Sequence, residues 1–261
     1  MRNFHFPGRS PVMAPSAMVS TSHPLATQAG IDVLKSGGNA VDAAIAACAT
    51  LCVVEPAMTG IGGDCFVLYS PRNSSKPIAL NGSGKSPAAA NVANLRDRGI
   101  EQIEIETPHA VNVPGAISAW TRLNTDYGTK DLTELLQPAI NYAENGFPIA
   151  PRVALDWADN LPKLLGDEVS SKILTVSGAA PKAGTTFAQP LLGTTLAAIA
   201  KGGRDAFYTG EIAEDMVTRL NKLGGLHTLD DFASCVADYV EPISVSYNKH
   251  TINECPPNGQ G

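Results

Sequence analysis

The sequence predicts a mixed α/β (α+β) chain that folds as one domain over residues 1–261. Several stretches carry apolar residues at three- and four-residue spacing, which is the pattern of amphipathic helices. Two pairs of short runs flank turn-forming residues, as strands of a β-hairpin do. The chain is long enough, at 44% hydrophobic residues, to bury a sizeable core, and no linker-like stretch interrupts it.

Two consecutive helices are predicted first, and the rest of the chain is expected to be arranged around the second. The first begins near Pro24, which suits a first helical turn, and ends at Gly37-Gly38. Asn39 is suited to cap the second helix, with Asp42 in its first turn. Because residues 40–54 are apolar on nearly every side, we expect this helix to be buried all round.

A glycine-rich loop, Thr59 to Gly63, follows the second helix and leads into an apolar run, Cys65 to Tyr69, that predicts a buried strand. Such a loop could cradle a phosphate, but phosphate loops run from a strand into a helix, and the order here is the reverse. The favoured interpretation is that the glycines let backbone pass close to backbone in a crowded interior.

The remaining elements follow from the same patterns. A hairpin is expected over residues 65–80 around the turn at 71–76, and a strand end and turn at 111–115. Further helices are predicted at 116–126, at 132–145 with a split at Pro138, at 150–165, at 190–201 closing at Gly202-Gly203, at 211–223, and from the Thr228 cap onward. A second hairpin is expected from 243–247 and 250–254.

Composition excludes several classes of protein. A net charge of −6 and a pI near 5.3 argue against a nucleic-acid partner, since a phosphate-binding surface needs a basic excess. The N-terminal residues 1–15 lack the apolar core of a signal peptide, and the apolar helix at 40–54 is shorter than the about 20 residues that span a bilayer. We therefore expect a cytoplasmic protein without a membrane partner.

The cysteines and histidines are scattered rather than spaced as metal ligands. Cys48 and Cys52 share a helix face, but no histidine or second pair accompanies them at metal spacing. Buried free thiols are the favoured interpretation, and no metal or cofactor is expected. Asp230 and Asp231 follow Thr228 at a helix start, so helix capping explains them better than acid–base chemistry.

The run SGGNAVDAAIAACATLCVVEPAMTGIGGDCF resembles the signature of the γ-glutamyltransferase family of N-terminal-nucleophile hydrolases, which includes cephalosporin-type acylases. Similarity continues in family order through VNVPGAISAW, LLQPAINYAENGFPI, AFYTGEIAEDM, GGLHTLDDF and ECPPNGQG. The resemblance implies an αββα sandwich, of which this chain is the large-subunit half. It also implies a self-cleaving zymogen, a small subunit as partner, and a small γ-glutamyl or related acyl amide of the glutathione type as substrate for transfer or hydrolysis.

The same resemblance places the catalytic threonine at the new N-terminus of the small subunit, where its own α-amine acts as base. No catalytic residue is therefore expected in this chain. Thr185 and Thr194 follow glycines but lie in a loop and in a predicted helix, before the PPNGQG landmark. We expect a chain truncated before the catalytic small subunit and inactive by itself. The alternative is a short, non-catalytic paralogue that serves as a binding or interaction module.

Two substrate-binding residues are predicted by carrying the family pattern over to this chain. Members that act on γ-glutamyl groups share a segment after the first hairpin whose arginine binds the α-carboxylate of the substrate. The corresponding residue here is Ser83, whose hydroxyl lacks the charged fork of arginine. Lys85, two residues on, could supply a point charge or could face solvent. Strict γ-glutamyl specificity is therefore not expected.

Overall fold

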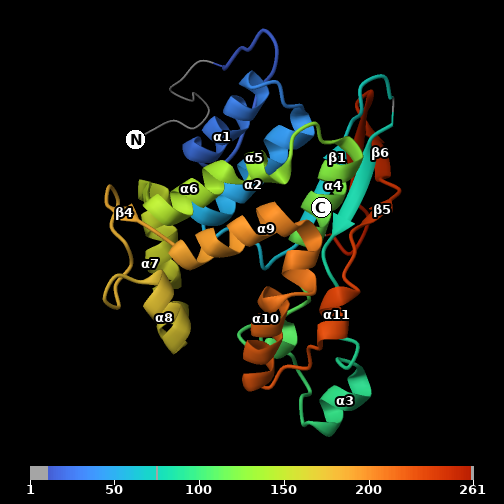
Figure 1. Ribbon diagram of the computed structural model, residues 1–261. Helices are drawn as coiled ribbons and strands as arrows, with labels where there is room; N and C mark the ends of the chain where they lie inside the picture. The colour runs from blue at the N-terminus through green and yellow to red at the C-terminus, as the bar shows by residue number, and fades with distance from the viewer. Residues whose placement is uncertain (1–10, 75, 260–261) are drawn as a thin grey trace.

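The computed structural model describes residues 11–74 and 76–259 (Figure 1). The helices are α1 (Pro24–Lys35), α2 (Ala40–Val54), α3 (Val92–Asp97), α4 (Ala116–Tyr127), α5 (Leu132–Leu135), α6 (Gln137–Asn145), α7 (Pro151–Leu165), α8 (Glu168–Leu174), α9 (Pro190–Tyr208), α10 (Glu211–Lys222) and α11 (Leu229–Ala233). The strands are β1 (Cys65–Tyr69), β2 (Ile78–Gly82), β3 (Phe147–Pro148), β4 (Thr186–Phe187), β5 (Asp238–Val240), β6 (Ile243–Tyr247) and β7 (His250–Glu254). None of the helices in these ranges is both long enough and apolar enough to cross a bilayer.

Helix α2 occupies the centre of the helical layer and packs against α1, α4, α5 and α6 (Figure 1). Asn39 and Asp42 form the predicted cap reciprocally, because each side chain accepts a hydrogen bond from the backbone N–H of the other residue. The expectation that α2 is buried all round is wrong for one face: Ala40, Ala44 and Cys48 are exposed. Nothing in the described ranges covers this apolar face.

Asp42 is a fully buried carboxylate that joins the start of α2 to the segment after α4. It accepts hydrogen bonds from the Asn39 N–H at 2.8 Å, from the Thr129 N–H at 3.0 Å and from the Thr129 hydroxyl. Burial by itself raises the pKa of Asp42, but these hydrogen bonds outweigh it and hold the pKa below the ordinary value. The ionised form is therefore the one that the fold stabilises.

Replacing Asp42 by alanine is expected to lower the free energy of unfolding by about 3 kcal/mol near neutral pH, because several buried donors lose their acceptor. The matched control is Asp32→Ala, which removes an exposed carboxylate from α1. Since the folded pKa of Asp42 is depressed, its contribution is present above the unfolded pKa of about 4 and is lost as the pH falls below it. Urea titrations at pH 7 and pH 3 check this, and equal losses for the two variants at pH 7 would contradict it.

The main sheet is antiparallel, with the strand order β1-β2-β5, and α4 packs against β1 and β2. The predicted hairpin of β1 and β2 is confirmed, with Cys65 opposite Gly82 and Tyr69 opposite Ile78. Strand β5 was not predicted, and it pairs with the other edge of β2 so that Asn81 lies opposite Asp238. This pairing brings residues some 150 positions apart in the sequence to one end of the sheet.

The hydrophobic core lies between this sheet and the helices. A second extensive contact within the core is the packing of α6 against α9. The split of the predicted 132–145 helix into α5 and α6 is confirmed, as are the helices at 116, 150, 211 and 229. The helix predicted to close at Gly202-Gly203 instead continues to Tyr208 across a kink at Gly203, whose φ is +60°. The non-helical backbone at Gly203 bends α9 at this point, and the helix resumes directly after it. Helices α3 and α8 were not predicted, and residues 111–115 form no strand.

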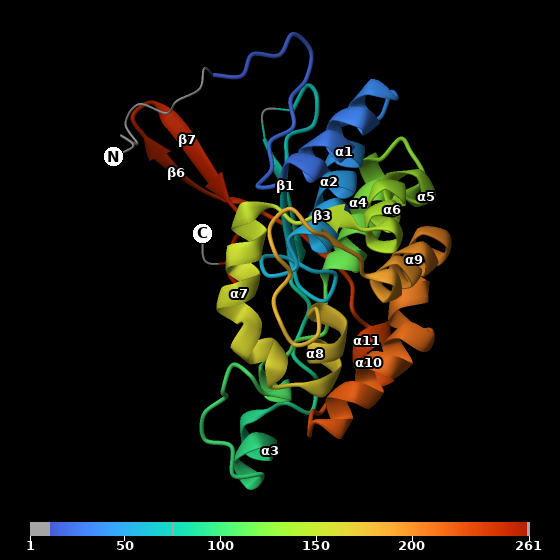
Figure 2. The same cartoon turned by 90° about the vertical axis from the view of Figure 1, so that its left-hand side faces the viewer.

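The β6–β7 hairpin stands away from the rest of the molecule (Figure 2). It was predicted from the alternation of polar and apolar residues, and both residues of its turn, Asn248 and Lys249, have positive φ. Its apolar side chains Ile243, Val245 and Tyr247 are 51, 61 and 64% exposed. The alternation normally marks one buried face of a sheet, but no segment among the described residues buries that face here.

The glycine loop between α2 and β1 is open, so the prediction of a crowded interior is wrong there. A Cβ atom placed on Gly60 or Gly62 would meet nothing within 4 Å. The carbonyl of Gly63 accepts the N–H groups of Gly115 and Ala116 at 3.0 and 3.1 Å, and so satisfies donors at the start of α4. The loop connects β1 to α4 through this carbonyl.

Candidate functional site

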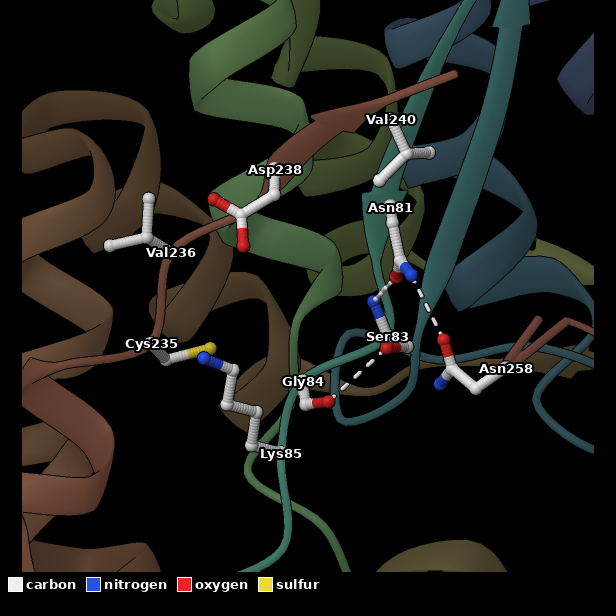
Figure 3. Close-up of a pocket in the computed structure, with 9 residues that line it drawn as sticks. All are labelled: Asn81, Ser83, Gly84, Lys85, Cys235, Val236, Asp238, Val240 and Asn258. Atoms are coloured by element: carbon white, nitrogen blue, oxygen red, sulfur yellow. Dashed lines mark hydrogen bonds between the residues drawn. The ribbon is translucent and has the colours of Figure 1, made fainter. Parts of the chain in front are cut away.

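A cavity of about 290 Å³ opens at the end of β2 (Figure 3). Three stretches of chain line it. They are the end of β2 with the loop that follows it, the segment at the start of β5, and the C-terminal Asn258. The lining residues are Asn81, Ser83, Gly84, Lys85, Cys235, Val236, Asp238, Val240 and Asn258.

Asn81 connects two of these stretches through the two ends of its amide. Its Nδ2 donates to Oδ1 of Asn258 at 2.9 Å, and its Oδ1 accepts the backbone N–H of Ser83 at 3.0 Å (Figure 3). The side chain therefore fixes the backbone of the loop and the position of the C-terminal segment together. In the sheet, Asn81 lies between Phe66 of β1 and Asp238 of β5.

The loop after β2 lies in close contact with the segment before α4. Gly84 has a φ of +76°, and a Cβ atom there would lie 1.7 Å from the carbonyl oxygen of Val113. A Cβ atom on Gly115 would likewise lie 2.2 Å from the carbonyl oxygen of Gly82. The N–H of Val113 donates to the carbonyl of Lys85 at 2.9 Å. Only glycine fits these positions, so the crowding predicted for the earlier glycine loop is found here instead.

The opposite wall of the cavity is held by Arg204, directly after the kink in α9. Its guanidinium donates to the carbonyl of Cys235 from both Nη2, at 2.7 Å, and Nε, at 3.2 Å. It also lies over the ring of Tyr208, 5.0 Å from the centroid, and the Tyr208 hydroxyl donates to Pro114 at 2.6 Å. Through Arg204, helix α9 therefore positions the segment from which Cys235 lines the cavity.

The thiol of Cys235 is buried at the inner end of the cavity. Burial raises its pKa and the nearby Asp238 acts in the same direction, whereas the positive charges of Arg204 and Lys85 act in the opposite one. Its Sγ lies 3.5 Å from the carbonyl of Pro114, as a weak donor. Since the pKa stays raised, the thiol is protonated at neutral pH and is a poor nucleophile.

Both residues predicted to bind substrate line this cavity. The Ser83 hydroxyl donates to the Gly84 carbonyl at 3.2 Å, and the Lys85 ammonium points toward Cys235 (Figure 3). Sequence reasoning missed the contributions of Cys235, Asp238 and Asn258. Only Asn258 had a signal, because it belongs to the PPNGQG stretch; the last two residues of that stretch lie outside the described residues.

The other candidate groups have local structural partners. Thr185 and Thr194 donate to the carbonyls of Lys182 and Pro190. Asp231 forms the predicted cap with Thr228 and also accepts the N–H of Ala88 at 2.9 Å. The capping interpretation is thus confirmed.

The prediction of buried free thiols holds for Cys52, Cys235 and Cys255 but is wrong for Cys48, which is exposed, while Cys65 is half-buried. Within the described ranges no three His, Cys, Asp or Glu side chains gather as metal ligands do. Residues 1–10, which include one of the scattered histidines, His5, and most of the stretch used to argue against a signal peptide, lie outside those ranges.

Comparison with known proteins connects this site to a family. The sequence model described as gamma-glutamyltranspeptidase matches residues 26–261. A glutathione hydrolase-like proenzyme, YwrD, of Bacillus subtilis is 37% identical over 96% of this chain and 47% of its own length. An oxamate amidohydrolase proenzyme of Klebsiella pneumoniae is 35% identical over 94% of this chain and 47% of its own length. The chain thus spans about half the length of these curated relatives.

Solved structures show the same relation in three dimensions. The gamma-glutamyltranspeptidase of Helicobacter pylori superposes with a TM-score of 0.88 at 32% identity, over 95% of this chain and 72% of that one. A cephalosporin acylase from Bacillus halodurans gives 0.87 at 36% identity, over 97% of this chain and 49% of that one. These matches confirm the predicted mixed fold, and the coverage of the acylase, like that of the curated relatives, corresponds to about half of such proteins.

Proposed function

Because the chain belongs to the gamma-glutamyltranspeptidase family, we propose that it is the large-subunit part of an amidohydrolase or acyltransferase acting on γ-glutamyl or related acyl amides. The observation that supports this most is the cavity at the end of β2. Its lining includes Ser83, at the position where the resemblance places the substrate-binding arginine, and Lys85 beside it. An acyl chain that ends in a carboxylate fits the chemistry of that wall.

In this proposal Lys85 supplies the charge that binds the distal carboxylate of the acyl group. An ammonium is a point charge with three donors, so it binds a carboxylate with less directional specificity than the fork of an arginine. Ser83 adds a neutral hydroxyl beside it, which is a weaker donor to a carboxylate than a charged group. The site is therefore suited to acyl groups with an acid end without being strict for the γ-glutamyl group.

The nucleophile of the proposed reaction is a threonine supplied by the other half of the enzyme. Its α-amine would accept the hydroxyl proton, the alkoxide would attack the amide carbonyl, and the amine would leave before water or an acceptor amine releases the acyl group. Two surfaces of this chain support a partner of that kind: the exposed apolar side chains of the β6–β7 hairpin and the exposed face of α2.

The test compares residues 1–261 alone with the protein made from the complete coding sequence. We expect the complete protein to cleave itself before a threonine and to release p-nitroaniline from γ-glutamyl or glutaryl p-nitroanilide. Residues 1–261 alone are expected to show no turnover above a blank. Mass spectrometry of the cleaved subunits and the anilide assay measure both, and a variant with that threonine changed to alanine is the control.

Turnover by purified residues 1–261 would contradict the placement of the nucleophile outside this chain. A coding sequence that stops at Gly261, or a complete protein that is uncleaved and inert toward both anilides, would favour the short paralogue that acts as a binding module.

A further inference from the structure

A buried tyrosine of α9 is hydrogen-bonded to the start of α4. Tyr208 is the last residue of α9, beyond the kink, and is fully buried. Its hydroxyl donates to the Pro114 carbonyl at 2.6 Å and accepts the Ser118 N–H at 3.1 Å. Burial raises the pKa of Tyr208, so the hydroxyl keeps the proton that it donates. One side chain of α9 therefore fixes two points at the start of α4.

The first of these points, Pro114, lies in the stretch that supports the wall carrying Lys85. On one side of it, Val113 donates its N–H to the carbonyl of Lys85 at 2.9 Å. On the other side, Gly115 lies so close to Gly82 that a Cβ atom on it would be 2.2 Å from the Gly82 carbonyl oxygen. A shift of Pro114 would therefore reach the backbone at both ends of the loop 82–85.

The second point, Ser118, supports the facing wall. Its side chain is buried, and its Oγ accepts the N–H of Ala237 at 2.8 Å. Ala237 lies between Val236 and Asp238, both of which line the cavity (Figure 3). Both walls are thus attached to the start of α4, and Tyr208 holds that start in place.

We propose that Tyr208 is a positioning residue, whose hydroxyl holds the two walls of the cavity at the spacing that the acyl group of the substrate requires. This inference rests on the proposed function and adds to it a residue outside the lining, which acts on the substrate through the backbone. Without the hydroxyl, the Pro114 carbonyl and the Ser118 N–H lose this partner, and the backbone on both sides can move. Lys85 would then meet the substrate carboxylate in a less defined position, which weakens binding.

The experiment measures kcat and KM of the complete protein for glutaryl and butyryl p-nitroanilide. Tyr208→Phe removes only the hydroxyl and is expected to raise KM for the glutaryl substrate about tenfold, because the carboxylate contact is weakened. The kcat values and the butyryl KM should change by less than about twofold. A merely structural role would instead reduce the fraction of folded enzyme, which lowers kcat for both substrates equally and leaves both KM values unchanged.

Trp157→Phe is the matched control, since it also removes a buried hydrogen-bond donor from an aromatic side chain. The Trp157 Nε1–H donates to the carbonyl of Leu174 at 2.7 Å, and neither residue lines the cavity. This variant should keep the KM values of the wild type. Ser118→Ala is a second test variant, because it removes the acceptor of the Ala237 N–H and keeps the Ser118 N–H for Tyr208. It should raise the glutaryl KM about threefold, as expected for the loss of one neutral hydrogen bond.

An unchanged glutaryl KM in Tyr208→Phe, or an equal rise in Trp157→Phe, would overturn this inference and leave the proposed function standing. If Tyr208→Phe yields no folded protein, Ser118→Ala decides the test: a raised glutaryl KM supports the inference and an unchanged one overturns it. Failure of the wild type to hydrolyse either anilide would overturn the proposed function and this inference with it.

Discussion

Replacing Lys85 by methionine is expected to lower kcat/KM about ten- to a hundredfold for acyl amides that carry a distal carboxylate. A charge-assisted hydrogen bond to a substrate carboxylate contributes roughly 1.5–3 kcal/mol, and each 1.4 kcal/mol corresponds to a factor of ten. Methionine keeps most of the length of the side chain and removes only its charge. The measurement compares glutaryl and butyryl p-nitroanilide with the complete protein, since the butyryl group lacks the carboxylate.

The butyryl substrate is the internal control, because its kcat/KM should change by less than about twofold when only a carboxylate contact is lost. Ser83→Arg provides the reciprocal change: a charged fork at this position should raise kcat/KM for glutaryl over butyryl substrates, where the wild type has only a hydroxyl. If Lys85→Met lowers activity toward both substrates equally, Lys85 does not bind the acid end of the substrate.

Gly84→Ala is expected to lower the free energy of unfolding by roughly 3–5 kcal/mol. Two effects add. The φ of +76° disfavours any residue with a Cβ atom, and the new methyl group would lie 1.7 Å from the carbonyl oxygen of Val113, so backbone must move. Because this contact shapes the cavity wall, activity toward acyl amides should fall together with stability.

Gly99→Ala is the matched control for this prediction. Gly99 also has a φ of +76°, but a Cβ atom there would meet nothing within 4 Å. The conformational cost alone is about 1–2 kcal/mol, so the difference between the variants isolates the contact with Val113. Urea unfolding of both variants gives this difference. Equal losses would show that the backbone near Gly84 adapts and that the close contact does not hold the cavity wall.

Local sequence features predicted the elements whose cause is local. Asn39 and Asp42 predicted the capped start of α2. Pro138 predicted the break between α5 and α6, and Asn248-Lys249 predicted the turn of the last hairpin. In each case the residues that decide the structure lie within a few positions of one another. The resemblance to a family added the location of Ser83 and Lys85.

The features that could not be predicted depend on distant pairs. Strand β5 has only three residues and exists because it pairs with β2, so nothing in residues 238–240 by themselves marks a strand. The place of Asp238 in the cavity follows from that pairing. The glycines at 60–63 and at 82–84 are similar in sequence, yet only at Gly82 and Gly84 would an added Cβ atom meet the backbone of a distant segment. Burial of α2 was overestimated because composition does not show which neighbours are present.

The β6–β7 hairpin has a consequence for the order of folding. Positive φ at both turn residues matches the twist of the two strands, so the hairpin can pair through contacts only a few residues apart, in about 1–10 μs. Isolated two-stranded hairpins are only marginally stable, so it would open and close until further strands join it. The hairpin is thus suited to act as an edge on which a later strand can pair. That strand would only extend a sheet that already exists, and would not have to nucleate a new one.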